Sequence, residues 1–115
     1  MTRSNPMVVN RVQLVGRLCY APNRYHIPGM PLKVAFRIAV PRSGSRMQSR
    51  PLRDWHMRSA DLITVVLFGQ AAHDLCGRQL SEGDWVSVHG RLSAPNRRGW
   101  EVVARTVEMP GWNNG

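Results

Sequence analysis

The amino-acid sequence predicts a small, mainly β domain, a barrel of five strands with one short helix between the third and fourth strands. Three observations lead to this prediction. Segments that alternate apolar and polar residues recur along the chain, turn-forming residues separate them, and one segment places its apolar residues at helical spacing instead. At 115 residues the chain is long enough for one hydrophobic core and too short for two, so we expect one domain.

The first strand is expected over residues 8–18, where apolar and polar positions alternate. Gly16 weakens a flat strand and suits a bulge or a tight bend, by which small barrels curve. Alternation divides the strand into two faces. The apolar face carries Val12, Leu14 and Leu18, and the opposite face carries Arg11 and Arg17.

The second strand is expected over residues 32–40, which alternate again and place Arg37 on the polar face. Residues 20–31 before it are rich in Pro and Gly and predict a loop with at most a short edge hairpin. Residues 41–60 after it lose the pattern and hold five Arg among Ser and Gly. Long loops in a compact domain are commonly functional, so we expect a flexible hairpin that becomes ordered on binding.

The third strand is expected over residues 62–68, because this run is nearly continuous in apolar and β-branched residues. Gly69 ends it and leaves Phe68 where a flat ring can meet a ligand. In residues 70–80 the apolar side chains recur at helical spacing and predict a short helix, although Gly77 weakens its last turn.

The fourth and fifth strands are expected over residues 85–92 and 101–109. A helix between the third and fourth of five strands is the layout of the OB-fold, a Greek-key barrel whose face and flanking loops bind oligonucleotides. We therefore expect a flexible N-terminus over residues 1–7, an OB-fold domain over 8–109 and a short tail over 110–115.

The charge composition favours a nucleic-acid partner. The formal net charge is +9, and 15 of the 16 basic residues are Arg, with Lys33 the exception. Guanidinium groups pair bidentately with phosphate and stack on bases and aromatic rings, so the excess of Arg points to nucleic acid. A solvated basic surface is the alternative. With no apolar run long enough to span a bilayer and no secretory signal, we expect a soluble intracellular protein.

Catalytic and metal-binding patterns are weak. Cys19 and Cys76 lack zinc spacing and are expected to be small buried thiols, although the sequence does not exclude a disulfide. The four His residues show no metal spacing, and neither a Ser/His/Asp order nor a phosphate-binding Gly loop occurs. We expect no enzyme activity, no metal and no cofactor.

Several segments resemble the bacterial single-stranded DNA-binding protein family. They are Asn-Arg-Val-Gln-Leu-Val-Gly-Arg-Leu at 10–18, Phe-Arg-Ile-Ala-Val-Pro-Arg at 36–42, Val-Val-Leu-Phe-Gly-Gln-Ala-Ala at 65–72, and Glu-Gly-Asp-Trp-Val-Ser-Val-His-Gly-Arg-Leu at 82–92. Glu-Val-Val-Ala at 101–104 extends the match. No single piece is diagnostic, but together they cover most of residues 10–109.

The resemblance implies a cytoplasmic, nucleoid-associated homotetramer that coats single-stranded DNA in replication, recombination and repair. The chain ends at Met-Pro-Gly-Trp-Asn-Asn-Gly, without the Gly- and Pro-rich linker and acidic tip usual in that family. Either the chain has been trimmed or it is a tail-less relative. A tail-less form favours the alternative, a homodimeric PriB-like primosomal protein that binds single-stranded DNA and replication proteins in replication restart. RNA binding is a third alternative, since nothing in the sequence senses a 2′-hydroxyl.

Candidate contacts combine rings for bases with cations for phosphates. The resemblance assigns base stacking to Phe68. Trp55 precedes by seven residues the family's Trp-His position, occupied here by Leu62 and Ile63, and is interpreted as a loop aromatic rather than a pair displaced by an insertion. Trp100 lies near another family aromatic, while Trp85 is equally compatible with packing, an interface or a ligand contact. The basic candidates are Arg11, Arg17, Arg37 and Arg91 on strands, and Arg42, Arg46, Arg50, Arg53, Arg97 and Arg98 on two loops.

Overall fold

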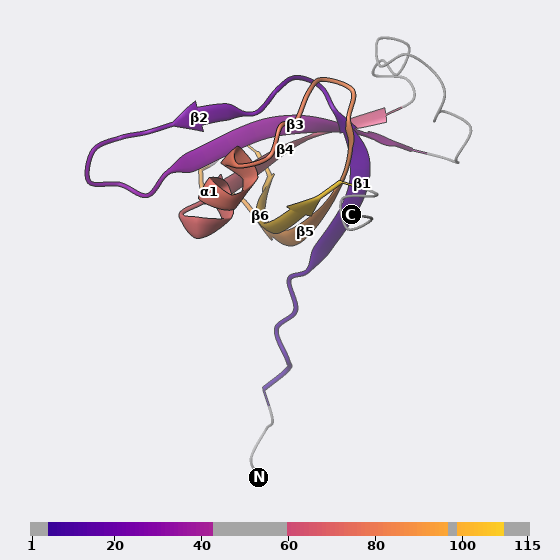
Figure 1. Cartoon of the computed structure of the whole chain (residues 1–115). Coiled ribbons are helices and arrows are strands. Elements are labelled where there is room, and N and C mark those ends of the chain that lie inside the picture. Colours follow the sequence, from indigo (N-terminus) through magenta and orange to yellow (C-terminus); the bar gives the residue numbers. More distant parts are fainter. Residues whose placement is uncertain (1–4, 43–59, 97–98, 110–115) are drawn as a thin grey trace.

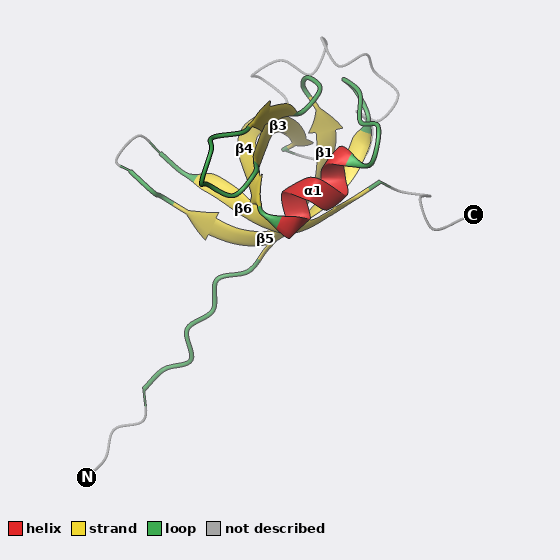
Figure 2. Cartoon of the chain, turned by 60° about the vertical axis from the view of Figure 1, so that its left-hand side comes forward, coloured by secondary structure: helices red, strands yellow, loops and turns green. Residues whose placement is uncertain are grey.

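The computed structural model describes residues 5–42, 60–96 and 99–109, and within them the chain forms a curved β-sheet with one helix (Figures 1 and 2). The helix lies across one end of the barrel and contributes buried side chains to its core. In chain order the elements are β1 (Val12–Leu18), β2 (Asn23–Tyr25), β3 (Lys33–Pro41), β4 (Ala60–Phe68), α1 (Gln70–Cys76), β5 (Trp85–Ser93) and β6 (Glu101–Glu108).

The barrel is closed, which confirms the predicted OB-fold. Its strands follow the order β1-β5-β6-β4-β3, and β3 pairs back onto β1 through Arg17 opposite Ala39 and Leu18 opposite Ile38. β4 and β6 run parallel, while the other paired strands are antiparallel. β2 lies outside this ring and pairs only with β3, so it is the short edge hairpin that the sequence allowed.

Gly16 lies where β1 and β3 meet. A Cβ atom at this position would stand 2.7 Å from the carbonyl oxygen of Ala39, so only glycine permits this approach of the two backbones. β1 runs past β5 without a register shift. The shift in the described ladders lies instead between β5 and β6, where His89 pairs with Thr106 and Gly90 with Ala104. Gly16 therefore serves the closure of the barrel rather than a bulge.

Alternation of side chains divides each strand between an apolar interior and an outer surface. No polar or charged residue is buried among the described residues. The bulkiest buried side chains come from five strands: Leu18, Val34, Phe36, Ile38, Val65, Val66, Leu67, Val86, Val88 and Val102. Three of them are consecutive in β4, so this strand is covered on both faces there, as its nearly continuous apolar sequence indicates.

The helix is shorter than predicted. α1 ends at Cys76, and Gly77 caps it with its amide donating to the carbonyl of His73. Leu80 is still buried, but it reaches the core from the segment that follows the helix. The apolar spacing over residues 70–80 therefore identified the side chains that contact the core. It predicted a helix that is one turn too long, because the helix ends at Gly77.

The two cysteines are free and half-buried. Burial raises the pKa of the Cys19 thiol, and the positive charge of Arg37 opposes that shift only in part. Cys19 therefore stays protonated near neutral pH and is a poor nucleophile. Over the described ranges, no cluster of three or more His, Cys, Asp or Glu is arranged to hold a metal ion. The helix in this part of the chain is too short to cross a membrane.

Gly16→Ala is expected to destabilise the fold by about 1–3 kcal/mol, because the added methyl group forces β1 and β3 apart. Urea unfolding monitored by circular dichroism measures this change. Gly77→Ala is the matched control, since its Cβ would meet only ordinary contacts at 3.5 Å. Equal stability of the two variants would contradict the closure role of Gly16.

Candidate nucleic-acid interface

The outer faces of β3 and β4 form one continuous surface. Their antiparallel register places Lys33 opposite Phe68 and Arg37 opposite Thr64, whereas Ala39, opposite Leu62, is buried. Residues paired in this way project to the same side of a sheet. The surface therefore combines apolar and basic side chains on neighbouring strands, outside the core.

At one end of this surface, two aromatic rings flank an ammonium group. Phe68 is 45% exposed and is thus not a core residue, and Tyr25 of β2 is 47% exposed. Lys33 Nζ lies 5.7 Å from the centre of the Tyr25 ring and 5.9 Å from that of Phe68. These distances permit cation–π contacts with both rings. The arrangement offers flat faces for bases and a cation for phosphate.

Trp100 lies beside the middle of β4, near Thr64. It lies just before β6, is 69% exposed, and lines a shallow cavity of about 230 Å³ together with Thr64 and Asn96. Thr64 and Phe68 are four residues apart on β4, which corresponds to about 13 Å of strand. The two groups of rings are therefore separated by the length of a few nucleotides.

The arginines near this surface differ in what they contact. Arg37 is exposed, and its guanidinium has no hydrogen bond or ion pair with any described residue. Arg42 forms an exposed ion pair with Asp61, 2.9 Å between Nε and Oδ1. Such surface pairs contribute about 0–1 kcal/mol and exchange readily for a phosphate. Arg37 is thus available to a polyanion, whereas Arg42 already has a carboxylate partner.

Arg17 is directed toward the protein. Its Nε donates to the carbonyl of Gly83 at 3.0 Å, and its guanidinium lies 5.9 Å from the centre of the Trp85 ring. Trp85 in turn packs against the small buried cluster of Ala39 and Ala60. Trp85 therefore has a packing role in the chain, and Arg17 contacts the start of β5.

Arg11 and Arg91 lie apart from the β3–β4 surface. They line a groove at the edge of β5 and β6, together with Arg105. Six further candidates lie outside the described residues: Arg46, Arg50, Arg53, Trp55, Arg97 and Arg98.

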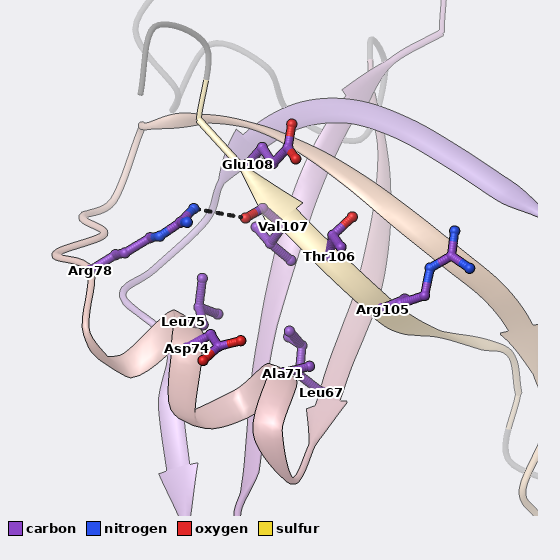
Figure 3. Close-up of a pocket in the computed structure, with 9 residues that line it drawn as sticks. All are labelled: Leu67, Ala71, Asp74, Leu75, Arg78, Arg105, Thr106, Val107 and Glu108. Carbon is purple, nitrogen blue, oxygen red and sulfur yellow. Dashed lines mark hydrogen bonds between the residues drawn. The ribbon is translucent and has the colours of Figure 1, made fainter. Parts of the chain in front are cut away.

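A small cavity of about 120 Å³ lies between α1 and β6 (Figure 3). Arg78 reaches across it and donates to the carbonyl of Val107 at 3.5 Å. Asp74 and Glu108 line it as well, so the cavity carries both signs of charge and does not extend the basic surface.

Comparison with known proteins places the chain in a family. The sequence model of the "Single-strand binding protein family" matches residues 9–109. The chain belongs to this family. A "Single-stranded DNA-binding protein" of Oceanobacillus iheyensis is 33% identical over 110 residues, which span 89% of this chain and 63% of that protein. The chain thus covers less than two-thirds of that family member's length.

Solved structures confirm the fold. The second single-stranded DNA-binding protein of Mycobacterium smegmatis superposes with a TM-score of 0.65 at 24% identity, covering 88% of each chain. The dimeric N-terminal domain of the PriB protein from Thermoanaerobacter tencongensis superposes with a TM-score of 0.62 at 23% identity, covering 87% of this chain and 94% of that one. The family's barrel is therefore shared by this chain.

The sequence analysis did not predict three basic or aromatic side chains that the structure places on the outer surface of this chain. Lys33 shares the polar face of its strand with Arg37, which was a usable signal. Tyr25 lies in a segment that was expected to be mostly loop, so the sequence did not indicate that it would be in a strand beside Lys33. Arg105 interrupts the alternation of β6, and its orientation depends on the irregular pairing with β5.

Arg17→Met is expected to lower the free energy of unfolding by about 1–2 kcal/mol, because it removes a hydrogen bond and a cation–π contact. Arg37→Met, the matched control, should change it by less than about 0.5 kcal/mol, as exposed residues without partners usually do. Urea denaturation of both variants makes the comparison. A larger loss of unfolding free energy in Arg37→Met than in Arg17→Met would contradict the conclusion that Arg17, and not Arg37, supports the fold.

Proposed function

We propose that this chain binds single-stranded DNA without regard to base sequence, using the outer face of β3 and β4. The observation that carries the proposal is the grouping of Lys33 between the Tyr25 and Phe68 rings, with Trp100 beside Thr64 of β4. Binding that tolerates any sequence needs rings on which bases stack and cations along the backbone. Membership of the single-strand binding protein family supports the same function.

In this mechanism the strand lies across β3 and β4 and the protein performs no covalent chemistry. Bases stack on Phe68, Tyr25 and Trp100, while Lys33 and Arg37 contact phosphates. Stacking uses the π-face that every base has, so it does not select a sequence. The Arg-rich segment 41–60 and the loop arginines at 97 and 98 supply further cations to the same strand.

The cellular role we propose is to coat and protect exposed strands during replication, recombination and repair, without a cofactor. The protein acts in the cytoplasm, associated with the nucleoid, and assembles as a homotetramer. Capture of replication-restart proteins combined with weak binding of oligo-dT would instead favour the PriB-like role and a homodimer. Competition between DNA and RNA oligomers of the same sequence measures whether the protein prefers deoxyribose or ribose.

Phe68→Ala is expected to weaken oligo-dT binding by about 1–3 kcal/mol, which corresponds to roughly 5- to 140-fold, because one stacking platform is lost. Titration of intrinsic tryptophan fluorescence measures the affinity, and Trp100→Ala should lose affinity and also most of the quenching. Phe68→Tyr is the control that keeps the ring and should bind like the unmodified chain. Equal binding by Phe68→Ala and Phe68→Tyr would remove Phe68 from the site.

The affinity should fall steeply with salt, since each phosphate contact contributes about −0.7 to the log–log slope, or roughly −3.5 for five contacts. Arg37→Met should make the slope shallower by about 0.7. Arg17→Met removes the same charge from a side chain directed at Gly83 and should leave the slope unchanged. Titrations at several NaCl concentrations test this, and a flat slope for the unmodified chain would exclude a phosphate-based mode of binding.

A further inference from the structure

The segment between β2 and β3 forms a hairpin tip, residues 26–32, that carries exposed apolar side chains. Ile27 is 60% exposed and Met30 is 61% exposed. From Tyr25 to Leu32 the chain has no Arg, Lys, Asp or Glu, although the protein as a whole has a net charge of +9. Figure 1 shows the tip extending beyond the barrel and α1. Large apolar side chains grouped on such a projection indicate a contact site.

The hairpin tip is a defined turn. The Met30 amide donates to the carbonyl of Ile27 at 3.0 Å, and Gly29 has a φ of 82°. A proline and this glycine thus occupy the two central positions of a type II turn, the second of which favours glycine. The Gly69 amide donates to the Leu32 carbonyl at 2.9 Å and joins the tip to the end of β4. Little conformational entropy is therefore lost when the tip contacts a ligand.

The two faces of the hairpin carry cations in different surroundings. Arg24 and Tyr25 are neighbours in β2, so their side chains project to opposite faces. On the Tyr25 face lie Lys33 and Phe68, which belong to the proposed site. On the other face, Arg24 Nη2 lies 3.5 Å from the carbonyl oxygen of Cys76, at the end of α1. The hairpin therefore presents a cation on each side of its apolar tip.

A groove of about 480 Å³ lies on the Arg24 face. Arg24 and Arg78 line it beside apolar residues, and none of its described lining residues is acidic. The guanidinium groups of both arginines donate to backbone carbonyls at 3.5 Å, which is long for a hydrogen bond. A phosphate offers each of them a shorter, charge-assisted bond. The groove is therefore suited to the backbone of a second strand.

A strand on the β3–β4 face reaches the hairpin tip when it leaves the rings. Ile27 lies two residues beyond Tyr25, about 7 Å along an extended chain, which corresponds to roughly two stacked bases. With no Arg or Lys in residues 26–32, the tip is poorly suited to phosphates. Apolar side chains instead pack on the flat faces of bases. The terminal base pair of a duplex presents a wide face of this kind, with one backbone on each side.

We propose that the hairpin tip packs on the terminal base pair where single-stranded DNA enters a duplex, so that the protein binds at junctions of single and double strands. One strand continues onto the β3–β4 face, and its complement passes along the groove at Arg24 and Arg78. Ile27 and Met30 contact both bases of the pair and select no sequence. The inference rests on the proposed function, which supplies the path of the first strand.

Fluorescence anisotropy compares a dT oligomer of about 10 nucleotides, the same oligomer joined to a DNA duplex through its 5′ or its 3′ end, and the duplex without a tail. The unmodified chain should bind one of the two tailed duplexes about tenfold more tightly than the oligomer, because the apolar tip is buried on the terminal base pair. Only one tail polarity should gain, since the tip lies at one end of the path of the strand. The duplex without a tail should bind most weakly.

Ile27→Ser combined with Met30→Ser should remove the gain at the junction and leave the affinity for the oligomer unchanged. Arg24→Gln should lower the affinity for the tailed duplex about fivefold and make its log–log salt slope shallower by about 0.9, again without changing the oligomer. Met7→Ser combined with Val8→Ser is the matched control, because these apolar side chains are at least as exposed but lie in the N-terminal segment. Equal urea midpoints verify that the variants are folded.

The measurements distinguish this inference from the proposed function. Failure of the unmodified chain to bind the oligomer would overturn the proposed function. Normal binding of the oligomer with no gain on either tailed duplex would overturn only the junction site. A gain that is equal for both tail polarities, or that survives in the Ile27→Ser and Met30→Ser double variant, would overturn it too. In that case the charge of the duplex, and not the hairpin tip, would cause the gain.

Discussion

The structure depends on the pairing that closes the barrel between β1 and β3. At Arg17, β1 is paired to Trp85 of β5 on one side and to Ala39 of β3 on the other, and Gly16 allows the Ala39 carbonyl to approach. A closed ring of strands has one interior, so alternation along each strand assigns every side chain to the core or to the outer surface. Within the described part of the chain, all charged groups are consequently on the outer surface.

The outer surface divides its cations by what they contact. Arg17 donates to a backbone carbonyl and lies over an indole ring, so its charge supports the fold. Arg37 has no such partner among the described residues, and Lys33 lies between two exposed rings. A guanidinium that already has an acceptor loses that bond when it turns to a phosphate, whereas an unpartnered one loses only water. Arg37 and Lys33 are therefore better suited to a polyanion than Arg17.

The bulge in β5–β6 shows how a local backbone irregularity places a side chain. Arg105 is the extra residue of β6, has no partner in β5 and is exposed.

Local pattern was sufficient for the strands, since inward and outward positions alternate every two residues whatever the partner strand. It correctly placed Leu18 inside and Arg37 outside, and the order of elements predicted the barrel. The grouping of Tyr25, Lys33 and Phe68 did not follow from it, nor did the orientations of Arg17 and Arg105. Those depend on register between segments that lie far apart in the chain, and register is set by long-range pairing, by a bulge and by closure. The chain's own alternation thus specifies which face a residue occupies, and folding specifies its neighbours there.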